Sequence, residues 1–214
     1  MAQYGFYFDS TRCTGCRTCV MSCKDYKDLS QTLAFRKVYD YEGGNWTATD
    51  GGGYTTDAFA YHVSVACNHC AVPACVPACP NSAIAKDPDT GIVSIDDEVC
   101  TGDASCVDAC PYGAPVIDLE KGQGIKCDMC QDRVAEGFVP ICVEACPLRA
   151  LDFGELDELT AKYGNDAAIA PLPSADQTYP SLVINLCPAA KQPGDAMGKI
   201  ANEKEIAGVE ALVR

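Results

Sequence analysis

The sequence predicts an α+β fold that is rich in loops and built from short strands and short helices. Cysteine accounts for 16 of its 214 residues, a density that points to bound metal or to disulfides. Alternating apolar residues are confined to brief segments such as Tyr4–Phe8, where Tyr4, Phe6 and Phe8 share one face as in a short strand. Residues 156–163 have the apolar spacing of a helix, and Gly164 follows them as a C-cap.

Further short strands and one hairpin are predicted along the chain. Residues 24–62 form an insertion, a β-hairpin in which Arg36–Tyr41 pairs with Phe59–Val65 across a turn-rich stretch. Trp46 lies in that stretch and is expected to pack locally, with contact to a partner protein as the alternative. Other strands are expected at Ala58–Val65, Gly91–Ile95 and Ser181–Leu186.

The C-terminal part, residues 165–214, is expected to hold a loop, a strand and a tail helix. Residues 165–180 are rich in proline and in small and polar residues, which predicts a surface loop. Glu203–Val213 carries apolar residues on one side, which predicts a short amphipathic helix. This helix either packs on its own domain or docks on a partner.

The cysteines form four groups with short internal gaps, and only Cys187 stands outside them. Three thiolates in a CxxCxxC loop can hold three corners of a four-iron cube, while the fourth corner is capped from elsewhere in the chain. This spacing predicts iron–sulfur clusters. It disfavours the separated pairs of a zinc site, and a disulfide scaffold would need an export signal that we do not expect here. The groups are Cys13, Cys16, Cys19 and Cys23; Cys67, Cys70, Cys75 and Cys79; Cys100, Cys106 and Cys110; and Cys127, Cys130, Cys142 and Cys146.

The third group departs from the pattern at Asp103, which stands where a cysteine is expected. A carboxylate can bind iron, although it is a harder and more exchangeable ligand than a thiolate. The site therefore holds either a [4Fe–4S] cluster with Asp103 on one iron, which we favour under reducing conditions, or a [3Fe–4S] cluster beside a solvated Asp103. We expect the unique iron to be lost easily on oxidation.

These four groups, in this order, resemble those of the iron–sulfur subunits of the dimethyl-sulfoxide reductase superfamily, which accompany molybdenum or tungsten pterin enzymes. The resemblance extends over residues 4–190. Its most specific segments are 67–70 (CNHC), 110–115 (CPYGAP), 126–130 (KCDMC) and 142–147 (CVEACP).

The resemblance implies two interleaved ferredoxin-like modules that hold two clusters each. Residues 1–23 and 123–164 would form one module, and residues 63–122 the other. Site A would take Cys13, Cys16, Cys19 and Cys146; site B would take Cys23, Cys127, Cys130 and Cys142; site C would take Cys67, Cys70, Cys75 and Cys110; and site D would take Cys79, Cys100 and Cys106, with Asp103 as a candidate fourth ligand.

The resemblance also implies a non-catalytic subunit of anaerobic respiration that relays single electrons. Its partners would be a molybdenum or tungsten pterin catalytic subunit and a second redox protein, such as a membrane quinol anchor, a cytochrome or a soluble donor. In relatives without a cysteine at the position of Asp103, the three-iron cluster lies at the end away from the catalytic subunit. The alternative is a free-standing soluble polyferredoxin that carries electrons among several enzymes.

Composition disfavours several other functions. The net charge of −14 would repel the phosphates of nucleic acid. No apolar stretch approaches the ~20 residues of a membrane-spanning helix, so we expect no membrane span in this chain. We expect a cytoplasmic protein, or one exported as a passenger with a partner that carries the export signal, and any membrane association would be made through a partner.

Three further side chains are assigned structural roles. His69 lies between two cysteines of the second group and is expected to make a structural hydrogen bond rather than bind iron. His62 alternates with apolar residues and is expected to be a surface histidine. Cys187 is expected to be a buried, inert thiol.

Overall fold

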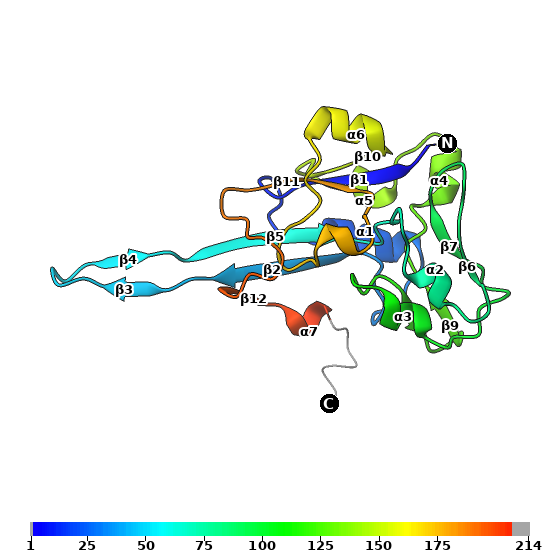
Figure 1. Ribbon diagram of the computed structural model, residues 1–214, viewed down its shortest axis with the longest axis horizontal. Helices are drawn as coiled ribbons and strands as arrows, with labels where there is room; N and C mark the ends of the chain where they lie inside the picture. Colours follow the sequence, from blue (N-terminus) through cyan, green and yellow to red (C-terminus); the bar gives the residue numbers. More distant parts are fainter. Residues whose placement is uncertain (1, 207–214) are drawn as a thin grey trace.

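The computed structural model describes residues 2–206 and confirms the predicted α+β class with short elements. Within these residues, two three-stranded sheets and three two-stranded hairpins are connected by short helices and long loops (Figure 1). The longest described helix, α1 (Thr18–Tyr26), has nine residues. No described helix is long and apolar enough to cross a membrane.

The first sheet has the order β10-β1-β11 and forms much of the apolar core. The predicted N-terminal strand is confirmed as β1 (Tyr4–Asp9), which runs antiparallel to β10 (Leu151–Glu155) and parallel to β11 (Leu182–Asn185). The predicted helix is confirmed as α6 (Leu156–Tyr163), and it covers this sheet through a stack between Tyr163 and Tyr7, with ring centroids 3.6 Å apart.

The second sheet continues into a long arm. Strand β2 (Lys37–Gly43) pairs antiparallel with β5 (Phe59–Val65), which confirms the predicted hairpin, and β12 (Gly198–Ile200) joins the other edge of β2. The hairpin extends through β3 (Trp46–Ala48) and β4 (Tyr54–Thr56), which project well beyond the rest of the molecule in Figure 1.

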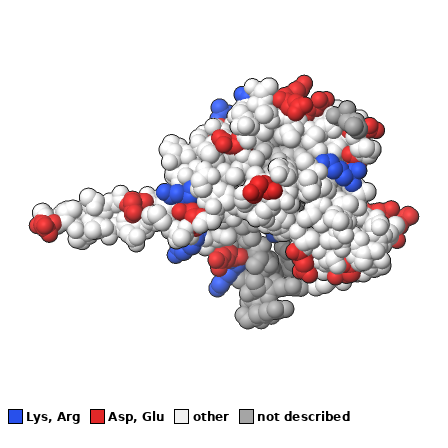
Figure 2. Space-filling view, viewed as in Figure 1, with Lys and Arg blue, Asp and Glu red and all other residues white. Residues whose placement is uncertain are grey.

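The outer part of this arm is exposed to solvent. Trp46 and Tyr54 are each 69% exposed, so the expectation that Trp46 packs locally is wrong. Trp46 pairs with Thr56 and Ala48 with Tyr54 across the two strands, which places both aromatic side chains on one face of the arm. Figure 2 shows acidic but no basic side chains along the outer arm. The alternative, contact of Trp46 with a partner protein, stays a prediction.

Two short hairpins and several short helices complete the described fold. Helices α2 to α5 carry or flank cysteines of the later groups. The remaining elements are β6 (Ile84–Lys86), β7 (Val93–Ile95), β8 (Val116–Asp118), β9 (Gln123–Ile125), α2 (Cys75–Ala78), α3 (Ser105–Ala109), α4 (Gln131–Ala135), α5 (Ile141–Glu144) and the 3-10 turn Ala175–Gln177.

The segment 165–180 is not the surface loop that its composition predicts. Ile169, Ala170 and Leu172 are at most 4% exposed and belong to the main core. The Tyr61 hydroxyl donates to the carbonyl oxygen of Ala170 at 2.9 Å, which ties the segment to β5. Proline prevents regular helix and strand here, but it does not prevent burial, and for this reason the prediction fails.

The predicted tail helix begins as expected. Helix α7 covers Glu203–Ile206, and the rest of the predicted range lies outside the described residues. Arg17 Nε lies 2.8 Å from Glu205 Oε1, so the described turn packs on its own domain, next to the first cysteine group.

Candidate metal centres

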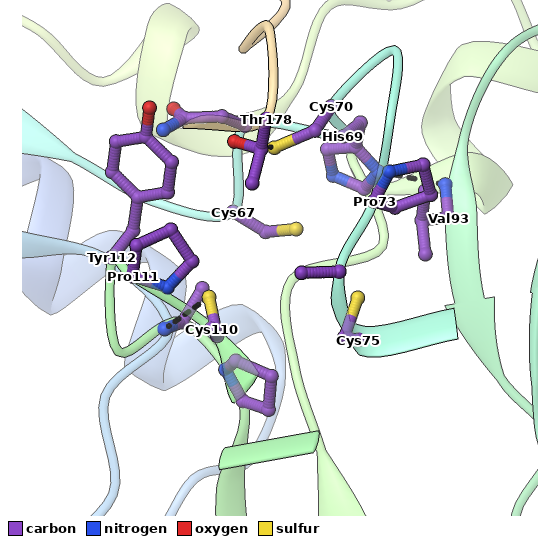
Figure 3. Close-up of a pocket in the computed structure, with 14 residues that line it drawn as sticks. Cys67, His69, Cys70, Pro73, Cys75, Val93, Cys110, Pro111, Tyr112 and Thr178 are labelled. Carbon is purple, nitrogen blue, oxygen red and sulfur yellow. Dashed lines mark hydrogen bonds between the residues drawn. The ribbon is translucent and has the colours of Figure 1, made fainter. Parts of the chain in front are cut away.

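Four cysteine side chains surround one cavity close to β5, α2 and the loop after α3. Cys67, Cys70, Cys75 and Cys110 all line it, and Figure 3 shows their sulfur atoms turned toward the same space. These are the cysteines that the resemblance assigns to site C. The structure therefore brings together thiols from two separate cysteine groups.

Local backbone and side-chain contacts hold the thiols of site C. Helix α3 ends at Ala109, and Pro111 directly after Cys110 prevents a longer helix. The amide of Ala114 donates to Cys110 Sγ at 3.5 Å, and Thr178 Oγ1 contacts Cys70 Sγ at 3.2 Å. Hydrogen bonds to sulfur favour the thiolate, the form that binds iron.

Three buried polar groups that line the cavity of site C have no hydrogen-bond partner among the described residues. They are Asn68 Nδ2, His69 Nε2 and Tyr112 Oη. Buried polar groups normally find partners, so unpaired ones call for a missing acceptor. A bound iron–sulfur cluster, with its sulfide and thiolate acceptors, fits both the converging thiols and these donors.

The structural role expected for His69 is confirmed. Its Nδ1 accepts a hydrogen bond from the amide of Val93 at 2.9 Å, and its side chain is fully buried. This bond assigns the ring proton to Nε2, the atom without a partner. Burial and the nearby charge of Lys126 hold the pKa of His69 well below its ordinary value, so the ring is neutral.

Site A forms a second cavity, close to β1 and α1. Cys13, Cys16, Cys19 and Cys146 line it. The amide of Ala150 donates to Cys146 Sγ at 3.3 Å. Cys16 is exposed, while Cys19 and Cys146 are buried, so this site reaches the surface at one corner.

Gly15 and His62 form a close contact at the edge of site A. His62 Nδ1 lies 2.7 Å from Asp40 Oδ1, and its side chain is 33% exposed. A Cβ atom on Gly15 would come within 2.6 Å of His62 Nδ1. The expectation of a simple surface histidine is therefore wrong, because Asp40 and Gly15 fix the ring against the first cysteine loop.

Gly15→Ala is expected to destabilise the first cysteine loop more than Gly122→Ala. Both glycines have φ +66°, so both variants are strained by an alanine in the left-handed conformation. Nothing lies within 4 Å of a Cβ atom on Gly122. Only Gly15→Ala must also displace His62, at a cost of about 1 kcal/mol or more. Thermal loss of visible cluster absorbance, recorded at one heating rate, measures the difference. Equal transition temperatures would show that the His62 contact does not constrain the loop.

Site D occupies a third cavity, beside α3 and the β6–β7 and β8–β9 hairpins. Cys79, Cys100 and Cys106 line it together with Asp103. The amide of Gly124 donates to Cys100 Sγ at 3.2 Å, and the amide of Ala83 donates to Cys79 Sγ at 3.3 Å. The structure thus places a carboxylate where the other sites have a fourth thiol.

Asp103 is exposed and already has one hydrogen-bond donor. Its Oδ1 accepts from the amide of Ser105 at 2.9 Å, and hydrogen bonding to Ser105 lowers the pKa of the carboxyl group. Asp103 is therefore an ionised carboxylate at neutral pH. Its second oxygen is available to a metal, and its exposure leaves it accessible to water.

Site B is the most deeply buried set. Its cysteines, Cys23, Cys127, Cys130 and Cys142, are all buried. Burial raises the pKa of Cys23 to about 12, and charge on Cys142 and Cys130 acts in the same direction. Burial also raises the pKa of Cys127 well above its ordinary value, with Cys67, Cys23 and Cys142 as its charged neighbours.

Burial also raises the pKa of thiols in the other sites, to about 11 for Cys13 and Cys70 and about 12 for Cys75. Thiols in such surroundings stay protonated unless a positive metal core stabilises the thiolates. Among the described residues, no three His, Cys, Asp or Glu side chains are arranged around a single metal ion. The cysteines of sites A, C and D line cavities, a geometry that suits a cluster of several irons.

The four sites lie in a row, in the order A, B, C, D. Cys19 of site A and Cys142 of site B belong to one cluster of packed side chains. Cys127 of site B and Cys67 of site C belong to another. Cys75 of site C and Cys106 of site D pack in a third, together with Ile84 and Val93. Each site therefore neighbours the next in this order.

Cys187, the one cysteine outside the four groups, is half-buried and packs against the main core. The expectation of a fully buried thiol is therefore wrong in degree, although the side chain does contact the core. Its amide donates to Ser10 Oγ at 2.7 Å.

Sequence reasoning missed two buried cations. Arg36 is 2% exposed and Lys126 is 6% exposed. Lys126 Nζ donates to the carbonyl oxygens of Val93 and Cys127, which places its charge between sites B and C. The only sign of Lys126 in the sequence is its position directly before Cys127. Arg36 is near no cysteine in the sequence, so nothing there indicates its location.

Comparison with known proteins gives a family model and close relatives. A model described as a 4Fe-4S dicluster domain matches residues 58–156. The B subunit of the anaerobic dimethyl sulfoxide reductase of Escherichia coli (strain K12) is 53% identical over 204 residues, covering 95% of this chain and 98% of the relative. The protein of the same name from Haemophilus influenzae is 52% identical over 206 residues, covering 96% and 100%. The hydrogenase-2 operon protein HybA of Escherichia coli O157:H7 is 36% identical over 193 residues, covering 82% and 58%.

Proposed function

Because this protein is a member of the family of iron–sulfur electron-transfer subunits that includes the B subunit of anaerobic dimethyl sulfoxide reductase, we propose that it holds four clusters and relays single electrons between a pterin-containing catalytic subunit and a second redox partner. The observation that carries this proposal is the row of four cysteine sets. A single row gives electrons one route through the protein. The chain itself is not a catalytic subunit.

The proposed ligands are the cysteines of sites A to D, with Asp103 as the fourth ligand of site D under reducing conditions. Bound iron–sulfur clusters supply one-electron oxidation and reduction. The thiolates of this chain hold them, and amide groups such as those of Ala114 and Gly124 donate to the ligating sulfurs. Buried side chains such as Phe8 and Met129 exclude water from the path. We infer three [4Fe–4S] clusters, and a fourth that is either [4Fe–4S] or [3Fe–4S].

The partners are proposed from the relatives and from the sites. Two relatives are named as the B subunit of a reductase, which supports a separate catalytic partner. We propose a large molybdenum or tungsten pterin subunit in that role. The second partner would be a membrane quinol anchor, a cytochrome or a soluble donor, and a membrane anchor would also bring this chain to the membrane.

A free-standing polyferredoxin is less well supported. Such a protein would hold the same clusters. We would then expect this chain to be strongly similar to small electron carriers that act alone. The match over 95% of the chain to a subunit of a reductase favours a subunit of a complex.

Anaerobic purification of the native protein tests this proposal. We expect a large partner to co-purify with this chain in equal amount and to contain molybdenum or tungsten, as quantified by mass spectrometry of the metals. If the chain carries its iron but purifies alone, with no second metal, a free-standing polyferredoxin explains the protein better than an electron-transfer subunit of a complex.

A further inference from the structure

Arg36 is a buried cation that lies between sites A and B. It directly precedes β2 and is among the largest fully buried side chains of the described residues. Its guanidinium carbon lies 4.9 Å from the centroid of the Phe6 ring, which belongs to the central strand β1. An arginine in such a place remains charged, because guanidinium does not lose its proton in proteins.

The hydrogen bonds of Arg36 are incomplete. Nη1 donates to Ser64 Oγ at 3.2 Å, and Ser64 Oγ lies 3.4 Å from Cys19 Sγ. Since Ser64 Oγ accepts from the arginine, its own hydrogen is free to point to the sulfur. Nε and Nη2 of Arg36 have no hydrogen-bond partner in the described part of the chain. Two strong donors of a buried cation are thus left without an acceptor among the described residues.

Cysteine ligands take the place of the carboxylate that a buried arginine usually needs. None of the ion pairs found between described residues includes Arg36. An unpaired buried charge is strongly unfavourable, so an anion must lie close by. Cysteines of both sites lie near Arg36. Ser64 Oγ, which accepts from its guanidinium, is 3.4 Å from Cys19 Sγ of site A. The preceding residue, Phe35, packs in one apolar cluster with Cys23 and Cys127 of site B.

We propose that Arg36 is the counter-charge of sites A and B, and that it raises the reduction potentials of the clusters there. This inference rests on the ligand sets of the proposed function. The two unpaired donors would bond to cluster sulfur, and the fixed positive charge would stabilise each cluster more strongly after it gains an electron. Cysteines of both sites lie near this charge, so both potentials are expected to rise.

The sign of the effect follows from charge alone. Four thiolates outweigh the positive charge of the iron–sulfur core, so each cluster is already anionic, and reduction adds one more negative charge. Attraction to a buried cation therefore grows on reduction, with little screening by water. Without Arg36 the reduced clusters lose this stabilisation, and electrons leave sites A and B for sites C and D.

Replacing Arg36 in the anaerobic complex tests the inference. We expect Arg36→Met to lower the equilibrium constants for reduction of the clusters at sites A and B by at least roughly tenfold, which is ~59 mV for one electron. The potentials at sites C and D should not move. A redox titration monitored by EPR measures the reduction potentials of all four clusters. Arg36→Lys, which keeps the charge, should restore most of the potential.

Arg12→Met is the matched control. Arg12 precedes a ligand of site A, but its side chain is 60% exposed and lies 3.4 Å from Asp9 Oδ2, so water and a carboxylate offset its charge. We expect no change in potential. If Arg36→Met fails to assemble clusters, Arg36→Gln removes the same charge while keeping an amide donor, and the same downward shift is expected.

Two results would overturn the inference. In the first, either neutral variant binds its clusters with unchanged potentials. In the second, Arg36→Lys lowers the potentials as much as the neutral variants do, which would show that the effect comes from the shape of the arginine side chain and not from its charge. Both outcomes differ from a failure of the proposed function. If the proposed function were wrong, the unmodified complex would itself lack clusters at sites A and B.

Discussion

Asp103→Cys is expected to make the cluster at site D resistant to oxidation. In the proposed site D of the unmodified protein, the unique iron would depend on an exposed carboxylate, a hard ligand that exchanges readily with water. Oxidation with ferricyanide should therefore remove that iron and produce the EPR signal of a three-iron cluster. A cysteine at the same position of the cavity would complete the four-thiolate set, and the three-iron signal should fall by roughly tenfold or more.

Asp103→Ala separates the two states that the sequence left open. If the carboxylate binds iron, the reduced protein has a complete cube at site D, and the alanine variant has one iron less. If Asp103 is only a solvated neighbour, the alanine variant and the unmodified protein contain equal iron under reducing conditions. The expected lability is contradicted if an oxidised sample of the unmodified protein gives no three-iron signal.

Cys127→Ala is expected to have the second large effect, loss of the site B cluster. Cys127 is 7% exposed and lies between the other site B thiols and Cys67 of site C. Water reaches so buried a position poorly and does not readily replace the lost sulfur. Iron content should fall by about four atoms per chain, and because metal binding stabilises the fold, the chain is also expected to become sensitive to proteolysis.

Cys187→Ala is the matched control for that experiment. It removes the same thiol from the one cysteine outside the four groups, at a half-buried position on the core. Iron content and cluster potentials should equal those of the unmodified protein. An iron loss in Cys187→Ala equal to that in Cys127→Ala would contradict the assignment of ligands to the four groups.

The local sequence was sufficient to predict those features that depend only on the spacing of nearby residues. The cysteine groups, with prolines after Cys79, Cys110 and Cys146, predicted metal sites because short gaps bring thiols close whatever the rest of the fold. Alternation in Tyr4–Phe8 and in Phe59–Val65 likewise predicted β1 and β5. Asp103 was visible as a departure from a regular spacing.

Contacts between distant segments could not be predicted in this way. Thr178 lies 108 positions from Cys70 in the sequence and yet contacts its sulfur, and nothing in the proline-rich segment around Thr178 indicates burial. Arg36 is linked to Cys19 through Ser64, which lies 28 positions away in the sequence, so the link depends on how the two strands of the hairpin come together. His62 was misjudged because its alternation in a strand does not show that Asp40 lies opposite on β2.

Counting iron and electrons in the anaerobically purified complex tests the central claim most directly. Four clusters predict about sixteen iron atoms in this chain, or about fifteen after oxidation, and four separate one-electron steps in a redox titration. The contribution of the catalytic partner is obtained from that subunit alone and subtracted. About eight irons and two steps would contradict the account, because the chain would then hold the two clusters of a simple ferredoxin and the row of four sites would not be a relay.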